Sequence, residues 1–433
     1  MTSPFAHAHA VHPDWRTALG RVLTQLQAQR PAPAVDAPTL GWCYVSDHHA
    51  PAAEALLAGL RERFPGAAWV GAVGVGVCAG AVEYFDEPGL VVMLAALPRE
   101  QFRVFSGQRP LPAASEGFRA YTAQVHADPA TPELGELIGE LGRRVDGRYL
   151  FGGLASSRNR TLTLAAEAGT AGGVYRGGLS GVAFSAEAGV VSRVSQGCQP
   201  IGTPRRITES ERNIVYALDG EPALDVLLRE LGVDENLPRE ALPRLRHTLA
   251  GLSEPEEEAE FGLPAQNPEF ATVARRGSFG TETRVRHIVG VDPQRRGVAV
   301  AELAPAGHQL AFCRRDVEAA RRDLVRIGAE IRSALEPEEL PLAAQALTGT
   351  RGGTALATGG SGRRMLGAVY VSCTGRGGAH FGAPSAELQL VRHALGGSTA
   401  EDLPLVGFFA AGEIGHRQLY GYTGVLTAFT APA

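Results

Sequence analysis

The chain has 433 residues, more than one ordinary core accommodates, so we expect two domains or a large pseudo-symmetric pair. Its net charge of −5 gives no positive field to attract nucleic acid or an anionic membrane, and no apolar run reaches the length of a membrane span. The five cysteines lack Cys-x-x-Cys spacing, and the N-terminus lacks the apolar core of a signal peptide. These features predict a cytoplasmic protein without a disulfide framework or a structural zinc site.

The first part of the sequence predicts alternating helices and strands. Asp14 can cap a helix within residues 1–35, and the histidines before it, His7, His9 and His12, predict a flexible start. The apolar patterns that follow predict a strand, a helix, a Gly-punctuated strand and an apolar strand. These elements lie at Trp42–Val45, after Pro51, at Trp69–Val77 and at Leu90–Leu97.

The same order of elements recurs along the chain. A shorter copy has a helix after Thr131 and strands at Tyr149–Ser156 and Gly181–Phe184, and another copy occupies Tyr370–Phe429. The repetition predicts an α/β fold with mixed sheets, in two pseudo-symmetric domains built from repeated strand-helix-strand units. It also places glycine-lined loops at matching strand ends, where small ligands bind in open α/β sheets.

The stretch between these copies is predicted to be mainly β. Ile214–Leu218 is β-prone, so we prefer a strand there to a helix, and a helix follows from Pro222 to Leu231. Three further strands predict an antiparallel meander, at Arg284–Val291, Val298–Leu303 and Gln309–Phe312. Asp316 then caps the longest helix. Two stretches predict polar connections, a solvated loop at Glu254–Glu260 and a linker at Glu336–Gly362.

Four motifs together suggest a family. They are Leu150-Phe-Gly-Gly-Leu-Ala-Ser156, Val285-Arg-His-Ile-Val-Gly-Val-Asp-Pro-Gln294, Ser372-Cys-Thr-Gly-Arg-Gly377 and Gly407-Phe-Phe-Ala-Ala-Gly-Glu-Ile-Gly415. With them the chain, from about Leu40 to its end, resembles the FIST family, named for F-box and intracellular signal transduction. The resemblance implies an N-terminal helix within residues 1–35, a FIST N-terminal domain at 36–215 and a FIST C-terminal domain at 216–433.

The resemblance also implies a sensory role through small-ligand binding. Amino acids are the ligand class proposed for the family, and some relatives bind haem and report nitric oxide. Many relatives are fused to, or encoded beside, kinases, chemoreceptors or cyclic-dinucleotide enzymes. This sequence leaves no segment for such an output domain, so we expect a bacterial protein that signals through a separate partner of one of these kinds.

Two charged residues are the main candidates for contacting a ligand. Arg376 is flanked by glycines, so its guanidinium is free either to grip a carboxylate or to form a salt bridge with Glu413. Glu413 has glycines on both sides, Gly412 and Gly415, and a buried carboxylate there needs a partner, either Arg376 or a ligand amine. If both face one cavity, they can hold the two charged ends of an amino acid.

The neighbouring loops supply the other candidates. The cation of Arg376 and open backbone nearby could lower the pKa of the Cys373 thiol, but we prefer the alternative that Cys373 is a small buried residue filling a strand end. The remaining predicted ligand-binding residues are Phe381, Gly412, His416, Arg158 and Asn159.

Three other functions stay open from the sequence, and one of them is a protein-interaction scaffold with an empty cleft. His380 and His416 flank the key loops and are haem candidates, which would make the protein a nitric-oxide sensor. The same histidines could act as bases for a Cys373 nucleophile in an enzyme. The sequence shows no spacing typical of a metal site, so we expect no other cofactor.

Overall fold

A computed structural model of the chain describes residues 4–29, 37–112, 117–147, 149–233, 244–245, 247–254, 283–336, 362–396 and 403–433. The predicted acidic loop beyond Glu254 and the predicted linker between Glu336 and Gly362 lie outside these residues.

Two parallel strands joined by a helix occur three times in the described chain. The first unit is β2 (Leu40–Ser46), α2 (Ala53–Arg63) and β3 (Ala68–Gly74). The second is β8 (Thr122–Ala127), α3 (Leu134–Arg143) and β9 (Tyr149–Leu154). The third is β22 (Arg363–Cys373), α9 (Ala386–Gly396) and β23 (Leu405–Ala410). The predicted α/β class with repeated strand-helix-strand units is confirmed.

Antiparallel strands extend each parallel pair into a mixed sheet. A return strand pairs with the first strand of each unit, namely β6 (Gly89–Ala95), β12 (Leu179–Phe184) and β26 (Thr423–Pro432). An outer strand then pairs with each return strand, namely β1 (Phe5–Val11), β7 (Phe102–Ser106) and β13 (Val190–Gln196).

One glycine has the same place in all three units. It lies in the second parallel strand, opposite the backbone of the first, at Gly71, Gly152 and Gly407. An added Cβ would lie 1.8, 2.0 and 1.7 Å, respectively, from the carbonyl oxygen of the residue opposite. Because backbone atoms cannot move aside, these strands need glycine, which accounts for the Gly-punctuated pattern in the sequence.

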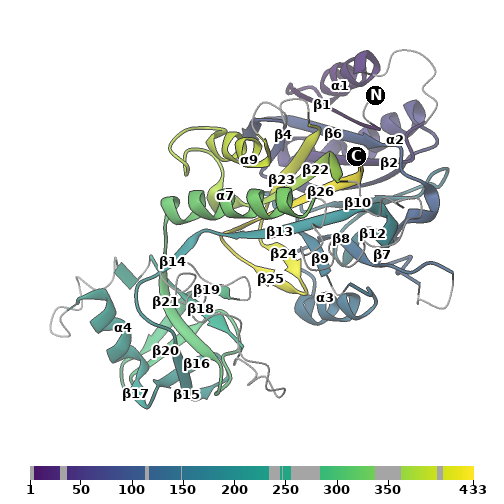
Figure 1. Ribbon diagram of the computed structural model, residues 1–433. Helices are drawn as coiled ribbons and strands as arrows, with labels where there is room; N and C mark the ends of the chain where they lie inside the picture. Colours follow the sequence, from purple (N-terminus) through teal and green to yellow (C-terminus); the bar gives the residue numbers. More distant parts are fainter. Residues whose placement is uncertain are drawn as a thin grey trace, which may run out of the picture.

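The three sheets are tied together because each unit contributes its next strand to another unit (Figure 1). β4 (Gly76–Ala79) follows β3 but pairs with β23 of the third unit. β10 (Thr163–Ala166) follows β9 but pairs with β3 of the first, and β24 (Glu413–His416) follows β23 but pairs with β9 of the second. Short partner strands complete three hairpins, namely β5 (Val82–Phe85), β11 (Val174–Tyr175) and β25 (Gln418–Tyr420).

The crossing segments meet at the side chain of Ser156, which is 4% exposed. Its hydroxyl oxygen accepts a hydrogen bond from the amide of Val75 at 2.9 Å and donates one to the carbonyl of Phe409. Its own amide donates to the carbonyl of Val73 at 3.0 Å. One serine therefore links backbone from the first, second and third units.

Helices cover the outer faces of the sheets, while the inner faces share one core. α1 (Trp15–Gln29) and α2 pack on the first sheet, α3 on the second, and α7 (Val317–Ser333) and α9 on the third. Residues from all three inner faces, including Trp42, Phe184 and Phe429, form a single apolar cluster.

A β domain with the helix α4 (Ala223–Leu231) is inserted between β13 and α7, and it lies beside the three-sheet core (Figure 1). Its sheet closes into a barrel because β21 pairs with both β15 and β18. The chain enters through β14 and leaves through β21, and these two strands pair with each other as a neck. Its strands are β14 (Cys198–Pro200), β15 (Arg205–Glu211), β16 (Ile214–Leu218), β17 (Glu221–Pro222), β18 (Thr248–Ser253), β19 (Arg284–Asp292), β20 (Gly297–Val300) and β21 (Gln309–Arg315).

The local signals at helix starts are confirmed, whereas some expectations need correction. Asp14 accepts a hydrogen bond from the Thr17 amide at 3.0 Å, and Asp316 accepts one from the Ala319 amide at 2.7 Å. The predicted flexible start is wrong, because His7 and His9 lie on β1, which pairs with β6, and the His12 amide donates to the carbonyl of Pro88 at 3.1 Å. The predicted meander is also wrong, because β20 pairs with β16 and not with β21. Residue 215, the expected division between domains, lies within β16.

We expect Ser156→Ala to lower the free energy of unfolding by about 1–3 kcal/mol, because it leaves the Val75 amide and the Phe409 carbonyl buried without a partner. Urea denaturation measures this loss. The control is Ser157→Ala, whose hydroxyl accepts hydrogen bonds in an exposed turn, and whose expected cost is about 0.5 kcal/mol or less. Equal, small losses in the two variants would contradict a role for Ser156 at the crossing.

Candidate ligand-binding site

The first parallel strand of each unit ends at an equivalent position in the fold. At two of these three strand ends, an aspartate side chain that follows the strand is hydrogen-bonded within the protein. Asp47 after β2 accepts hydrogen bonds from the amide, Nε and Nη2 of Arg158, at 2.8–3.0 Å. Asp128 after β8 accepts from the amides of Ala130 and Gly177 at 3.0 and 2.9 Å. The third end, after Cys373, continues into the Gly-rich loop and faces the barrel.

Arg376 is buried in an ion pair, and its partner differs from the expected one. Its Nη2 lies 2.6 Å and its Nε 2.7 Å from Oε1 of Glu387, and both side chains are 1% exposed. Glu387 also accepts hydrogen bonds from the hydroxyls of Tyr370 and Ser372 at 2.7 and 2.8 Å. The expected salt bridge with Glu413 is therefore wrong: Arg376 holds the start of α9 against the end of β22.

Glu413 lies close by but in a different bonding arrangement. Its Oε2 accepts hydrogen bonds from the amide and hydroxyl of Thr423 at 3.1 and 2.7 Å, whereas its Oε1 has no partner among the described atoms. Complete burial raises the pKa of this carboxyl to about 8, against the lowering effect of Thr423 and Arg376. At neutral pH the side chain is therefore largely protonated.

Cys373 contacts the Glu413 carboxyl, and its environment suppresses the thiolate. Burial, followed by the charge of Glu413, raises the pKa of the Cys373 thiol to about 12. The lowered pKa considered from the sequence is therefore wrong, because burial outweighs the lowering effect of Arg376, and Cys373 packs at the strand end as the preferred alternative expected.

A cavity of about 520 Å³ lies between the barrel and the core, next to this loop. We call it the interdomain cavity. It is lined by His247, Leu249, His287, Arg314 and Arg315 from the barrel and by His380 and Tyr422 from the core. None of these described lining residues is acidic, and two are arginines, so the cavity suits an anionic group.

Arg315 connects the two sides of the interdomain cavity. It donates a hydrogen bond to the carbonyl of Gly375, and its guanidinium lies 4.9 Å from the centroid of the Tyr422 ring. Its Nη2 lies 3.3 Å from Nδ1 of His380. Burial, with the charges of Arg315 and Arg376, lowers the pKa of His380 to about 4, so the ring is neutral at pH 7. With Nδ1 accepting from Arg315, Nε2 carries the proton and is a further donor.

Tyr422 has a backbone conformation that is costly for a bulky residue. Its φ of 62° lies in the left-handed region, which costs about 1–3 kcal/mol for a side chain of this kind. The hydroxyl of Tyr422 lies 2.7 Å from Nε2 of His287 on β19. The strained turn thus places an aromatic ring from the core against the barrel, where a ligand would contact both.

The structure brings together some predicted residues and separates others. Phe381 is buried with its ring 5.3 Å from the guanidinium of Arg376, so it packs beneath the loop. Gly412 precedes β24, and the chain then buries Glu413. His416 lies against the ring of Tyr149, at 4.6 Å between centroids, and is not among the lining residues of the cavity.

Arg158 and Asn159 belong to the first strand end and not to the third. Arg158 also forms an ion pair with Asp86 at 2.6 Å, and the Asn159 amide donates to the Ser157 hydroxyl within a turn. The two haem candidates are not brought together either, because His380 lines the interdomain cavity and His416 does not. Haem binding stays a prediction, which the visible absorption spectrum of the protein tests.

Sequence reasoning missed the residues that line the cavity from the barrel. Arg314 and Arg315 end β21, just beyond the predicted strand at Gln309–Phe312, and an adjacent pair of arginines at a strand end was the available signal. Tyr422 offered a weaker signal, as an aromatic residue between Gly421 and Thr423 in a short turn.

Two family models match the chain in succession. The FIST N domain matches residues 39–221, and the FIST C domain matches residues 223–416. The chain belongs to the FIST family. FIST domains are sensory domains of signal transduction, so the resemblance carried by the sequence motifs is confirmed. The third sheet of this FIST protein combines strands from both matched regions, since β4 pairs with β23.

Mycobacterial proteins are similar to this FIST protein along most of its length. An uncharacterized Mycobacterium tuberculosis protein is 29% identical over 409 residues, which cover 90% of this chain and 91% of its own. An uncharacterized Mycobacterium bovis protein is 28% identical over 413 residues, which cover 92% of each chain. Among the described helices, none has the length and apolar composition that crossing a membrane requires.

We expect Arg376→Ala to lower the free energy of unfolding by about 3–5 kcal/mol, because it leaves the buried charge of Glu387 without its cation. The control Arg144→Ala removes an arginine that is 41% exposed and paired with Glu140, and should cost about 0.5 kcal/mol or less. Urea denaturation compares the two. A loss for Arg376→Ala no larger than the control would show that the pair is not structural.

We expect the stability of the protein to fall as pH rises from 4.5 to 8, through protonation of Glu413. The pKa of Glu413 is raised from 4.5 to about 8, so the folded state keeps a proton that the unfolded chain releases in this window. Glu413→Gln mimics the protonated side chain and should be more stable relative to the native protein at pH 8 than at pH 5. Urea denaturation at both pH values measures this, with the half-exposed Glu140→Gln as control. An unchanged difference between pH 5 and pH 8 would contradict the assignment.

Proposed function

We propose that this FIST protein senses a small carboxylate, of amino-acid-like size, that binds in the interdomain cavity and alters how the barrel sits on the core. The observation that carries the proposal is the composition of the cavity. Two arginines, a neutral histidine and a strained tyrosine line it, without an acidic residue among the described lining.

Arg314 is the residue best placed to bind the carboxylate. Its side chain makes no hydrogen bond or ion pair to any described residue, whereas Arg315 already binds Gly375 and His380. A guanidinium without a partner among the described residues is available to bind a carboxylate bidentately. Arg376 and Glu413 were predicted to bind the two charged ends of an amino acid. This proposal assigns the carboxylate to Arg314 instead, because Arg376 forms an ion pair with Glu387.

The cavity is built from two parts of the fold that share a narrow connection. The barrel joins the core through the paired strands β14 and β21, and the amide of Asp316 donates to the carbonyl of Gly197 at 3.0 Å beside them. A ligand that contacts both parts favours the arrangement in which both contacts are made. Such a shift gives a signal that a separate partner, such as a kinase, a chemoreceptor or a cyclic-dinucleotide enzyme, can read.

We expect at least one of glycine, glutamate, succinate and N-acetylglycine to raise the melting temperature of the protein, because binding to the folded state stabilises it by mass action. Arg314→Ala should weaken that binding by about 10- to 100-fold, the effect of losing a hydrogen bond to a charged group. Differential scanning fluorimetry and isothermal titration calorimetry measure the two effects.

The matched control is Arg206→Ala, which removes an exposed arginine of the same barrel that does not line the cavity. It should bind like the native protein, and Arg314→Lys should bind with intermediate affinity because it keeps the charge but not the fork of donors. If none of the four carboxylates shifts the melting temperature, or if Arg314→Ala binds normally, the proposal is overturned.

A further inference from the structure

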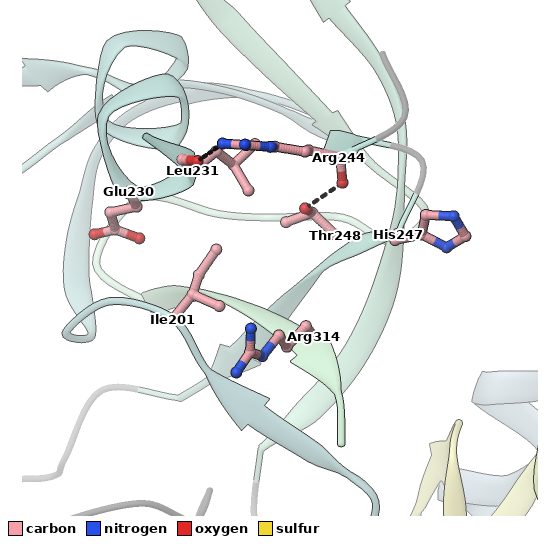
Figure 2. Close-up of a pocket in the computed structure, with 7 residues that line it drawn as sticks. All are labelled: Ile201, Glu230, Leu231, Arg244, His247, Thr248 and Arg314. Carbon is pink, nitrogen blue, oxygen red and sulfur yellow. Dashed lines mark hydrogen bonds between the residues drawn. The ribbon is translucent and has the colours of Figure 1, made fainter. Parts of the chain in front are cut away.

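A second cavity, of about 470 Å³, lies in the barrel next to the first (Figure 2). We call it the barrel cavity. It lies between the end of α4, the start of β18 and the end of β21. It is lined by Ile201, Glu230, Leu231, Arg244, His247, Thr248 and Arg314. Arg314 and His247 also line the interdomain cavity, so the two cavities have a common boundary.

The pairing of β18 with β21 shows on which face of the sheet each cavity lies. Thr248 of β18 lies opposite Arg314 of β21, and Leu249 lies opposite Cys313. Side chains alternate between the faces of a sheet, so Thr248 and Leu249 point to opposite faces. Thr248 lines the barrel cavity and Leu249 lines the interdomain cavity. The two cavities therefore lie on opposite faces of this strand pair. Arg314 lies directly opposite Thr248 and shares its face, that of the barrel cavity, while His247, just before β18, lies where the two cavities meet.

Among the described residues, Arg244 and Glu230 have partners in the barrel cavity, although Oε2 of Glu230 accepts no hydrogen bond, whereas the side chain of Arg314 has no partner. Arg244 donates hydrogen bonds to the carbonyls of Leu231 and Gly232 at 2.7 and 3.2 Å, and so caps the C-terminus of α4. Glu230 lies 3.7 Å from Arg205 and its side chain is 11% exposed. The side chains of Ile201 and Leu231 supply the aliphatic part of the lining. Figure 2 shows Ile201 across the cavity from Arg244 and Thr248.

We propose that the two cavities form one bipartite site for a carboxylate that carries an aliphatic chain, of the class of N-acyl amino acids. The carboxylate binds Arg314 where the two cavities meet, beside His247, and the acyl chain packs against Ile201 and Leu231 in the barrel cavity. This inference rests on the proposed carboxylate-sensing function, and it adds the chemical class of the ligand.

The chain length of the ligand is the quantity that tests this. Burial of one methylene contributes about 0.8 kcal/mol, or roughly a fourfold gain in affinity. N-hexanoylglycine has four more methylenes than N-acetylglycine and the same carboxylate. If the chain enters the barrel cavity, the full-length protein should bind N-hexanoylglycine on the order of 100-fold more tightly, as measured by isothermal titration calorimetry.

Filling the barrel cavity should remove this preference. Leu231→Trp, at the end of α4, and Ile201→Trp, between β14 and β15, both add volume to its aliphatic wall. In each variant the affinity ratio of the two acylglycines should fall to within about twofold, while N-acetylglycine binds as before. The matched control is Ile214→Trp, in the same barrel but outside the lining, which should keep the preference. Two variants on different elements guard against one failing to fold, which thermal unfolding reports.

The outcomes separate the inference from the proposed function. Equal binding of the two acylglycines by the native protein, or a preference that persists in both tryptophan variants, overturns the bipartite site but leaves carboxylate binding intact. Failure of both acylglycines and of the simple carboxylates to bind overturns both. Tight binding of N-hexanoylglycine that Leu231→Trp and Ile201→Trp abolish supports the bipartite site.

Discussion

The hydroxyl of Ser156 bonds to backbone of two other units at the point where three chain segments cross between sheets. The crossing matters because each sheet is completed by a hairpin from a different unit. The hairpin that follows β23 carries Glu413, and the turn after it carries Tyr422. The position of the tyrosine against the barrel therefore depends on the third unit being anchored to the second through β24 and β9.

The three equivalent strand ends show how one fold provides closed and open sites. At the first end an arginine from another unit binds Asp47, and at the second end backbone amides bind Asp128. At the third end Arg376 turns inward to Glu387, which leaves the outer side of the loop free to face the barrel. The buried ion pair thus keeps the loop in place without occupying the cavity that the loop borders.

The sequence predicted what is local and missed what depends on long-range pairing. The glycines opposite a neighbouring carbonyl and the apolar strands around them produced a visible repeat, and Asp14 and Asp316 marked helix starts correctly. Which strand pairs with which is not encoded in such patterns, so the exchange of hairpins could not be predicted.

The candidate site followed the same rule. Arg376 and Glu413 were chosen as candidate ligand-binding residues because glycines lie on both sides of each. Both are indeed buried near Cys373. The partner of Arg376 is Glu387, in the first turn of α9, and the pattern of this helix gave no reason to prefer it over other acidic residues. Arg314 and Tyr422 come from distant segments and different parts of the fold, so their meeting becomes visible only in three dimensions.

The exchange of hairpins also bears on how the chain is made. The first sheet can be completed once β11 has left the ribosome, but β4 waits for β23, and β9 waits for β24. β13 waits for β26 in the same way, so β13 and edges of β4 and β9 are unpaired during most of synthesis, and such edges invite aggregation. Strands that are more than 200 residues apart also pair slowly, because the entropy of closing a long loop is lost before the pairing contacts form. A nascent chain of this protein is therefore a natural client for chaperones that shield open sheet edges until the C-terminal strands emerge.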